Sequence, residues 1–160
     1  MPISCRFTLN GMLMSVLRCS GVGNFPAFSG QLYGRDNSSM TFKTEIGSLP
    51  KGRYFIVGRE SGSRMNTIRM AYLKYIYGAD RGPWFALYRD DGKIDDWTFV
   101  DGVRRGNFRL HPNGPKSLSE GCVTLFQQTD FDYFRSALLK TTMMPIKGSS
   151  MKAYGTIMVD

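Results

Sequence analysis

The stretch LHPNGPKSLSEGCVTL, residues 110–125, holds two short apolar runs separated by a loop rich in glycine, proline and serine. This pattern predicts two strands joined by a loop. We place the strands at 108–111 and 122–126 and expect them to lie side by side and antiparallel. The stretch also contains the single histidine of the chain, His111, and one of its three cysteines, Cys122.

Similar signals predict further strands on both sides of this stretch. Asn10-Gly11 between two apolar runs is typical of a hairpin with a two-residue turn. The turn Asp90-Asp91-Gly92 predicts a second hairpin, and residues 21–30 are expected to form a loop. The strands expected in addition to the first two are 3–9, 12–18, 53–59, 84–89, 94–100 and 154–159.

Two segments carry helical signals. Apolar side chains between Met65 and Tyr77 fall at helical spacing. The segment 129–140, TDFDYFRSALLK, begins with Thr129 as a candidate N-cap and has acidic residues in its first turn. The sum is a mainly β fold, a compact β-sandwich or barrel with one or two short helices. We expect residues 1–160 to form a single domain, a size that supports a core without disulfides.

Composition and charge limit the function classes. Apolar residues make up 42% and charged residues 21% of the chain, as in ordinary soluble domains. The formal net charge of +8 favours polyanionic partners such as nucleic acid, anionic lipid or a carboxylate-rich cell wall. No aromatic-rich nucleic-acid motif is present, and no apolar run reaches transmembrane length. We therefore expect neither nucleic-acid binding nor membrane insertion, and no Sec signal at the N-terminus.

The other two cysteines, Cys5 and Cys19, are predicted to be small buried apolar residues. A two-residue turn at Asn10-Gly11 sets Cys5 opposite Val16. Cys19 then has the other parity along its strand and points to the other face of the sheet. We therefore predict no bond between Cys5 and Cys19.

His111 and Cys122 together suggest nucleophilic catalysis. A thiol with a pKa of about 8.5 is mostly protonated at neutral pH, and a nearby imidazole can take its proton. Gly121 leaves the backbone open to an incoming carbonyl, and the amides around Gly121 and Cys122 are candidates for an oxyanion hole. We therefore predict a cysteine nucleophile with a histidine base. Some group must orient His111, and a backbone carbonyl and a side chain are both possible.

The segment around this pair is basic. Residues 102–119 contain no acidic side chain. Cationic neighbours lower the pKa of a thiol and suit a substrate that bears carboxylates. The basic side chains of this segment are Arg104, Arg105, Arg109 and Lys116.

Three alternatives stay open at this point. A structural zinc site would need more ligands than one histidine and one cysteine supply, so we expect no metal and no other cofactor. Cys122 and His111 would equally serve a cysteine amidase or endopeptidase that cuts a different bond of the cell wall. In a non-enzymatic basic binding module, Cys122 would only pack.

Ser119-Glu120-Gly121-Cys122, with His111 upstream, resembles the His…Ser/Thr-x-Gly-Cys signature of the L,D-transpeptidase catalytic domain. RRGNFRLHP (104–112) and SEGCVTL (119–125) resemble the core of a subgroup, the type VI secretion effectors with an L,D-transpeptidase fold. Two further segments, LNGMLMSVLRCSGVGNFPAFSG (9–30) and LPKGRYFIVGR (49–59), are similar to the framework of that subgroup. The resemblance thus spans nearly the whole chain.

The resemblance implies a β-rich transpeptidase fold with Cys122 as nucleophile and His111 as base. Ser119 and Gly121 occupy the signature positions that shape the nucleophile loop. The implied reaction removes the terminal D-Ala from a tetrapeptide stem of peptidoglycan through a thioester, which water or a D-amino acid resolves. The implied partners are the type VI secretion apparatus, which would deliver the protein into the periplasm of a target cell, and a cognate periplasmic immunity protein.

The sequence departs from the L,D-transpeptidase pattern at three positions. Pro112 replaces the glycine after the histidine, and Glu120 replaces the histidine of the nucleophile motif. Thr124 replaces an arginine that, in the family, contacts the substrate carboxylate. We therefore predict that Arg109 or Arg105 binds the substrate carboxylate in this chain.

Overall fold

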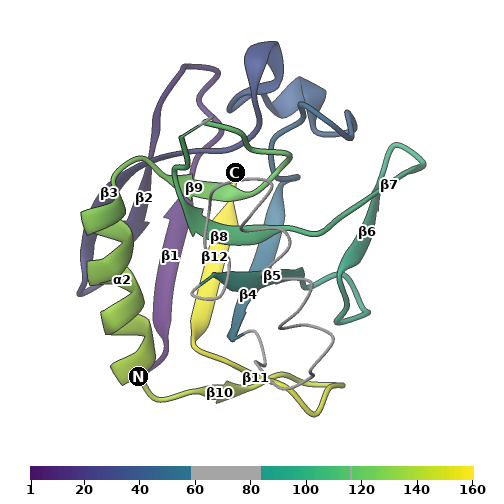
Figure 1. Ribbon diagram of the computed structural model, residues 1–160. Coiled ribbons are helices and arrows are strands. Elements are labelled where there is room, and N and C mark those ends of the chain that lie inside the picture. The colour runs from purple at the N-terminus through teal and green to yellow at the C-terminus, as the bar shows by residue number, and fades with distance from the viewer. Residues whose placement is uncertain (59–83, 116) are drawn as a thin grey trace, which may run out of the picture.

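The computed structural model describes residues 1–58, 84–115 and 117–160. The helix predicted from Met65 to Tyr77 lies outside the described residues. The largest element is a closed barrel of eight strands (Figure 1). Its strands are β1 (Ile3–Phe7), β2 (Ser15–Cys19), β3 (Gly23–Phe28), β4 (Gly52–Gly58), β5 (Phe85–Arg89), β8 (Arg109–Pro112), β9 (Val123–Leu125) and β12 (Gly155–Val159).

Around the barrel the strands follow the order β1-β12-β4-β5-β8-β9-β3-β2. The first and last strands, β1 and β12, pair in parallel, with Ile3 opposite Gly155. The chain also forms a β6–β7 hairpin (Trp97–Val100 and Val103–Gly106) and a β10–β11 pair (Met144–Pro145 and Lys152–Ala153). The prediction of a mainly β, barrel-like fold is confirmed.

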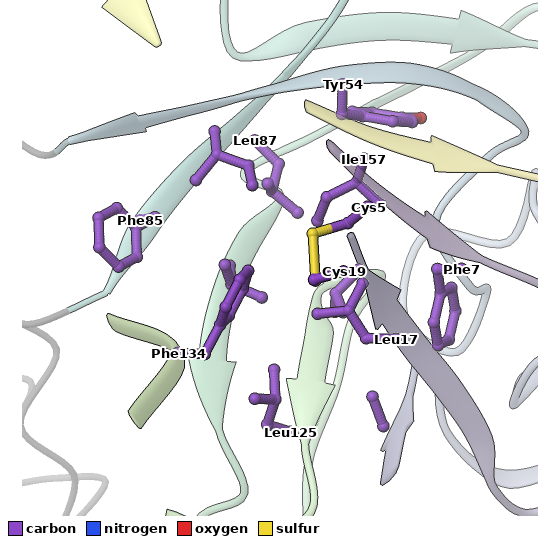
Figure 2. Close-up of a cluster of buried hydrophobic side chains, with 14 of the residues drawn as sticks. Cys5, Phe7, Leu17, Cys19, Tyr54, Phe85, Leu87, Leu125, Phe134 and Ile157 are labelled. Atoms are coloured by element: carbon purple, nitrogen blue, oxygen red, sulfur yellow. A yellow bond between two sulfur atoms is a disulfide. The ribbon is translucent and has the colours of Figure 1, made fainter. Parts of the chain in front are cut away.

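Apolar side chains from the barrel strands form the main core (Figure 2). Alternate residues of β1 and β12 are buried, as expected for strands with one face on a core. Helix α2 (Gln128–Lys140) packs on this core through Phe131, Phe134 and Leu138. In Figure 1 it lies on the side of the barrel away from the β6–β7 hairpin.

The helix at 129–140 is confirmed, but the prediction of Thr129 as its N-cap is wrong. The helix begins at Gln128, and the cap residue is Gln127, which makes no side-chain capping bond. Thr129 therefore lies inside the first turn. The acidic residue of that turn is Asp130, whose negative charge interacts favourably with the positive end of the helix dipole.

The predicted register of the first hairpin is also wrong. Strands β1 and β2 pair with Cys5 opposite Cys19, and residues 8–14 form a loop instead of a two-residue turn. The Asn10 side chain organises this loop, since it accepts from the Met12 N–H at 3.0 Å and donates to the Met14 carbonyl at 2.9 Å. Because Cys19 rather than Val16 lies opposite Cys5, the side chain of Cys19 points to the same face of the sheet as that of Cys5.

This register brings Cys5 and Cys19 together as a disulfide, which corrects the prediction that they stay unbonded. Their α-carbons lie 4.1 Å apart, and both residues are buried. Figure 2 shows the bond inside the core, beside Leu17 and Ile157. The disulfide therefore links two neighbouring strands from the interior of the barrel.

Three more expectations about the sheet are corrected. Most of residues 21–30 is not a loop, since β3 buries Phe25 and Ala27 and pairs with β2 and β9. Strands β5 and β6 do not form a hairpin, because β5 pairs with β4 and β8 while β6 pairs with β7. Asp101 and Gly102, at φ of 50° and 77°, make the β6–β7 turn.

Strands β8 and β9 run parallel, where we expected them to be antiparallel. The intervening segment carries the chain back to the starting end of β8 before β9 begins. Leu110 lies opposite Val123, and His111 lies opposite Thr124. This register sets the relation between the histidine and the cysteine.

We predict that reducing the Cys5–Cys19 disulfide lowers the free energy of unfolding by about 3 kcal/mol, the loop-entropy value for a closed loop of this size. The two cysteines are separated by 14 positions. Urea unfolding of the Cys122→Ala variant, with and without reductant, measures the difference free of exchange with the third thiol. Equal midpoints in the two conditions would contradict the prediction.

Candidate active site

The pairing of β8 with β9 places His111 and Thr124 on the same face of the sheet. Leu110 and Val123 point into the main core. Since side chains alternate along a strand, their neighbours His111 and Thr124 point to the other face. Cys122 lies immediately before β9, two positions before Thr124.

Three contacts fix the His111 ring, which is 5% exposed. Its Nδ1 lies 2.8 Å from the Pro112 carbonyl oxygen, and its Nε2 lies 3.3 Å from Thr124 Oγ1. Trp84 stacks on its face, with ring centroids 4.2 Å apart and 19° between the planes. A carbonyl only accepts, so Nδ1 carries the proton and Nε2 is the basic nitrogen of the neutral ring.

Cys122 lies outside the disulfide and is partly exposed. Its Sγ lies 3.9 Å from the main-chain oxygen of Asn107, the residue that precedes Phe108 at the start of the β8 segment. The thiol therefore lies close to the residues that precede β8, and part of the Cys122 side chain is accessible to a reagent or substrate.

Ser119 anchors the backbone of the nucleophile. Its side chain is buried, donates to the Cys122 carbonyl at 3.1 Å and accepts from the Gly30 N–H at 3.1 Å. Arg35 adds a second link, from its Nη2 to the Ser117 carbonyl at 3.4 Å. The loop after β3 thus holds the loop that carries Cys122.

Gly121 occupies a position that no other residue fits without strain. Its φ is 102°, a conformation that L-residues rarely adopt. A β-carbon there would lie 2.5 Å from Arg105 Nη2 and 2.9 Å from Phe108 Cε1. Among the described residues none accepts a hydrogen bond from the Gly121 N–H, which leaves that donor available.

Arg105 is buried behind this loop, only 2% exposed. Its Nη1 donates to the carbonyls of Thr41 and Ser48, and its Nη2 donates to those of Gly47 and Glu120, both within 3.3 Å. Burial lowers the pKa of Arg105 below its ordinary value, while negative charge on neighbouring groups, Cys122 included, acts in the opposite direction.

Arg109 forms a bidentate ion pair with Asp96, at 2.6 and 2.8 Å, and its side chain is 17% exposed. Burial alone would lower the pKa of Arg109, but the hydrogen bonds and charge of Asp96 raise it above its ordinary value, helped by Tyr88 and Cys122. Both arginines of the carboxylate-binding prediction therefore already have protein partners.

No group of three or more His, Cys, Asp or Glu side chains within residues 1–58, 84–115 and 117–160 is arranged to hold a metal ion. Within the same ranges, no helix has both the length and the apolar character needed to cross a membrane.

The family model described as the Tlde1 domain matches residues 23–149, a range that includes every site residue described above. The chain belongs to the Tlde1 domain family. This family comprises type VI secretion effectors of the L,D-transpeptidase type, with antibacterial activity related to peptidoglycan. Membership implies delivery into target cells by the type VI apparatus and a cognate immunity protein. No curated protein and no solved structure matches the chain.

Within the Tlde1 domain, sequence reasoning proposed the pair of His111 and Cys122 but did not name the side chains that contact His111. Thr124 was noted only as the replacement for an arginine, yet its hydroxyl contacts His111. Trp84 carried no signal beyond its place at the start of a predicted strand. The Pro112 carbonyl resolves which group contacts His111 Nδ1, a choice that the sequence left open.

Asp36 lies in the loop that holds the nucleophile loop of the Tlde1 domain. Its Oδ1 accepts from the Ser29 N–H at 2.8 Å, and its Oδ2 is buried without a partner among the described residues. Burial raises the pKa of Asp36 to about 7, although the Ser29 hydrogen bond and Arg35 both lower it.

We predict that Asp36→Asn stabilises the protein at pH 8 by on the order of 2 kcal/mol and has much less effect at pH 4.5. The folded pKa of about 7 exceeds the ordinary 3.8, so the folded state binds more protons between these values. The contribution of Asp36 is therefore fully present below about pH 4 and lost as the pH rises through 7. Urea unfolding at the two pH values measures it.

Asp101→Asn is the matched control, because Asp101 has nearly the same φ as Asp36, 50° against 49°, and is exposed. The control should change little at either pH. An Asp36→Asn effect that is the same at pH 4.5 and pH 8 would refute the buried titration.

Proposed function

We propose that the protein is a cysteine-dependent L,D-carboxypeptidase that removes the terminal D-Ala from tetrapeptide stems of peptidoglycan. The observation that carries this proposal is the parallel β8–β9 register. It sets His111 opposite Thr124, two positions after Cys122, and the Nδ1 of this histidine lies 2.8 Å from the Pro112 carbonyl oxygen, which leaves Nε2 as its basic nitrogen. Family membership supports the peptidoglycan target.

In the first half-reaction His111 Nε2 takes the thiol proton, and Cys122 Sγ attacks the carbonyl carbon of the diaminopimelate residue. The carbonyl electrons move to the oxygen, which the Gly121 and Cys122 N–H groups stabilise. When the C–N bond breaks, the histidine returns its proton to the amine of D-Ala. A thioester on Cys122 remains.

In the second half-reaction His111 takes a proton from water, and the water oxygen attacks the thioester carbon. The C–S bond breaks, the thiolate leaves and is reprotonated, and a tripeptide stem with a free carboxylate is released. A D-amino acid that attacks in place of water would restore a stem with a new terminal residue. L,D-transpeptidase exchange is thus the same chemistry with a different acceptor.

The proposed site of action is the periplasm of the target cell, after synthesis in the producing cytoplasm and transfer by the type VI apparatus. Loss of the terminal D-Ala removes donors for wall crosslinking. A Cys5–Cys19 disulfide is compatible with an oxidising compartment. We further propose that residues 1–160 act as a single catalytic domain.

We predict that the wild-type protein releases one D-Ala from isolated disaccharide-tetrapeptides, whereas Cys122→Ala and His111→Ala each abolish release. If the two residues act as a unit, the double variant loses little more than either single one. Mass spectrometry of the digest, with and without an added D-amino acid, reads both hydrolysis and exchange.

Each outcome of this digest has a distinct meaning. Cleavage at another bond, abolished by Cys122→Ala, would retain the nucleophile and indicate an amidase or endopeptidase. An untouched substrate would overturn the proposed enzyme in favour of a basic binding module. Independent, multiplicative losses for Cys122 and His111 would contradict a paired mechanism.

We assign the substrate carboxylate to Arg109 ahead of Arg105, because its side chain is the more exposed of the two. Arg109→Ala should raise the apparent KM about tenfold with a smaller change in kcat, the pattern for lost substrate binding. Arg18→Ala, on the exposed side of β2, removes the same charge as a control. An unchanged KM in Arg109→Ala would rule the assignment out.

A further inference from the structure

Arg105 is the most deeply buried cation near Cys122, and its environment differs from that of Arg109. The guanidinium of Arg109 faces the carboxylate of Asp96, whose charge offsets its own. The four acceptors of Arg105 are all main-chain carbonyl oxygens, which are dipoles without net charge. No carboxylate of the described residues therefore contacts this buried positive charge.

Two distances place that charge beside the Glu120–Gly121 peptide, which immediately precedes Cys122 in the sequence. Arg105 Nη2 lies 3.3 Å from the Glu120 carbonyl, which belongs to the peptide that leads into Gly121. The same Nη2 lies 2.5 Å from where a Gly121 β-carbon would stand. The guanidinium also sits over the Phe108 ring, 5.4 Å from its centroid, which limits its freedom to move away.

The peptide geometry links this contact to the donor of the oxyanion hole. In a trans peptide the C=O and the following N–H point in opposite directions. Since the Glu120 carbonyl points to Arg105, the Gly121 N–H points away from the guanidinium. That N–H finds no acceptor among the described residues. Arg105 therefore orients a donor that has no hydrogen-bond acceptor among the described residues.

The guanidinium, fixed in low dielectric, also interacts electrostatically with Cys122. A nearby fixed cation favours the thiolate over the thiol, and water screens this effect less inside a protein than at its surface. Ionisable groups of the described residues in this region include Arg109 with its partner Asp96, His111 on β8, and the exposed Glu120 on the same loop as Cys122.

We propose that Arg105 is the positioning residue of the site: its buried guanidinium orients the Glu120–Gly121 peptide and supplies the fixed charge that holds Cys122 as a thiolate. This inference rests on the proposed nucleophilic role of Cys122. It gives Arg105 a role in the site in addition to the one proposed for Arg109. It also separates the two arginines, with Arg109 toward the substrate and Arg105 behind the nucleophile.

The test is the pH dependence of Cys122 alkylation by iodoacetamide in the folded, disulfide-bonded protein, followed by peptide mapping. Only a thiolate reacts, so the midpoint of the rate profile reports the thiol pKa. Arg105→Met should move that midpoint upward by one unit or more, about a tenfold slower reaction at pH 6.5. Arg105→Lys keeps a charge and should stay near the wild-type profile.

Arg104→Met is the matched control. Arg104 is the neighbour of Arg105 on β7 but is exposed and lies over the Trp97 ring, so the substitution removes the same net charge from the opposite face. Its alkylation profile should equal that of the wild type. The proposal would be overturned if the alkylation profile of Arg105→Met equalled those of the wild type and of Arg104→Met.

A second readout keeps the proposal testable if Arg105→Met does not fold. In the wild type alone, the alkylation midpoint of Cys122 in the native protein should lie below its midpoint in urea, and equal midpoints would overturn the proposed charge effect. On tetrapeptide substrate, Arg105→Lys should lower kcat with little change in KM, because the peptide contact is altered. A raised KM with an unchanged kcat would instead return Arg105 to substrate binding.

Failure of this inference is distinguishable from failure of the proposed function. Alkylation needs no peptidoglycan, so an Arg105-dependent midpoint together with an inert tetrapeptide would preserve the inference and reject the carboxypeptidase. Release of D-Ala together with an alkylation midpoint that does not depend on Arg105 would keep the carboxypeptidase and reject the inference about Arg105.

Discussion

The parallel hydrogen bonding of β8 to β9 is the interaction on which the rest of the structure depends. It joins the half of the barrel that ends at β5 and β8 to the half that begins at β9 and β3. Its register sends Leu110 and Val123 into the core and His111 and Thr124 to the opposite face. Closure of the barrel and assembly of the site are therefore one event, and a slip of one residue would undo both.

Main-chain groups hold most of the site together. The Pro112 carbonyl fixes the tautomer of His111, and the Ser119 hydroxyl donates to the Cys122 carbonyl. Arg105 donates hydrogen bonds to four carbonyls that come from two loops. Such contacts depend on the path of the backbone and tolerate change in side chains around them.

Sequence patterns predicted the strands well where hydrophobic runs were bounded by turn residues, as at 53–59, 154–159 and the two strands around Cys122. They failed where long-range pairing decided the outcome. Asn10-Gly11 had the composition of a tight turn, but the Asn10 side chain instead closes a wider loop. Arg105 was predicted, with Arg109, as a candidate for substrate binding, and its burial was not foreseen because burial among carbonyls leaves no mark in local composition. Trp84 was likewise invisible as a partner of His111, since their contact joins β8 to the residue before β5.

The adjacency of β1 and β12 has a consequence for how the molecule is made. Ile3 pairs with Gly155, so β1 gains one of its two neighbouring strands only after residues 155–159 have been synthesised. Contacts between residues so distant in sequence slow folding, because the chain loses much freedom before they form. During translation, one edge of β1 stays unpaired while the chain emerges from the ribosome. The closed barrel can form only after residues 155–159 have emerged.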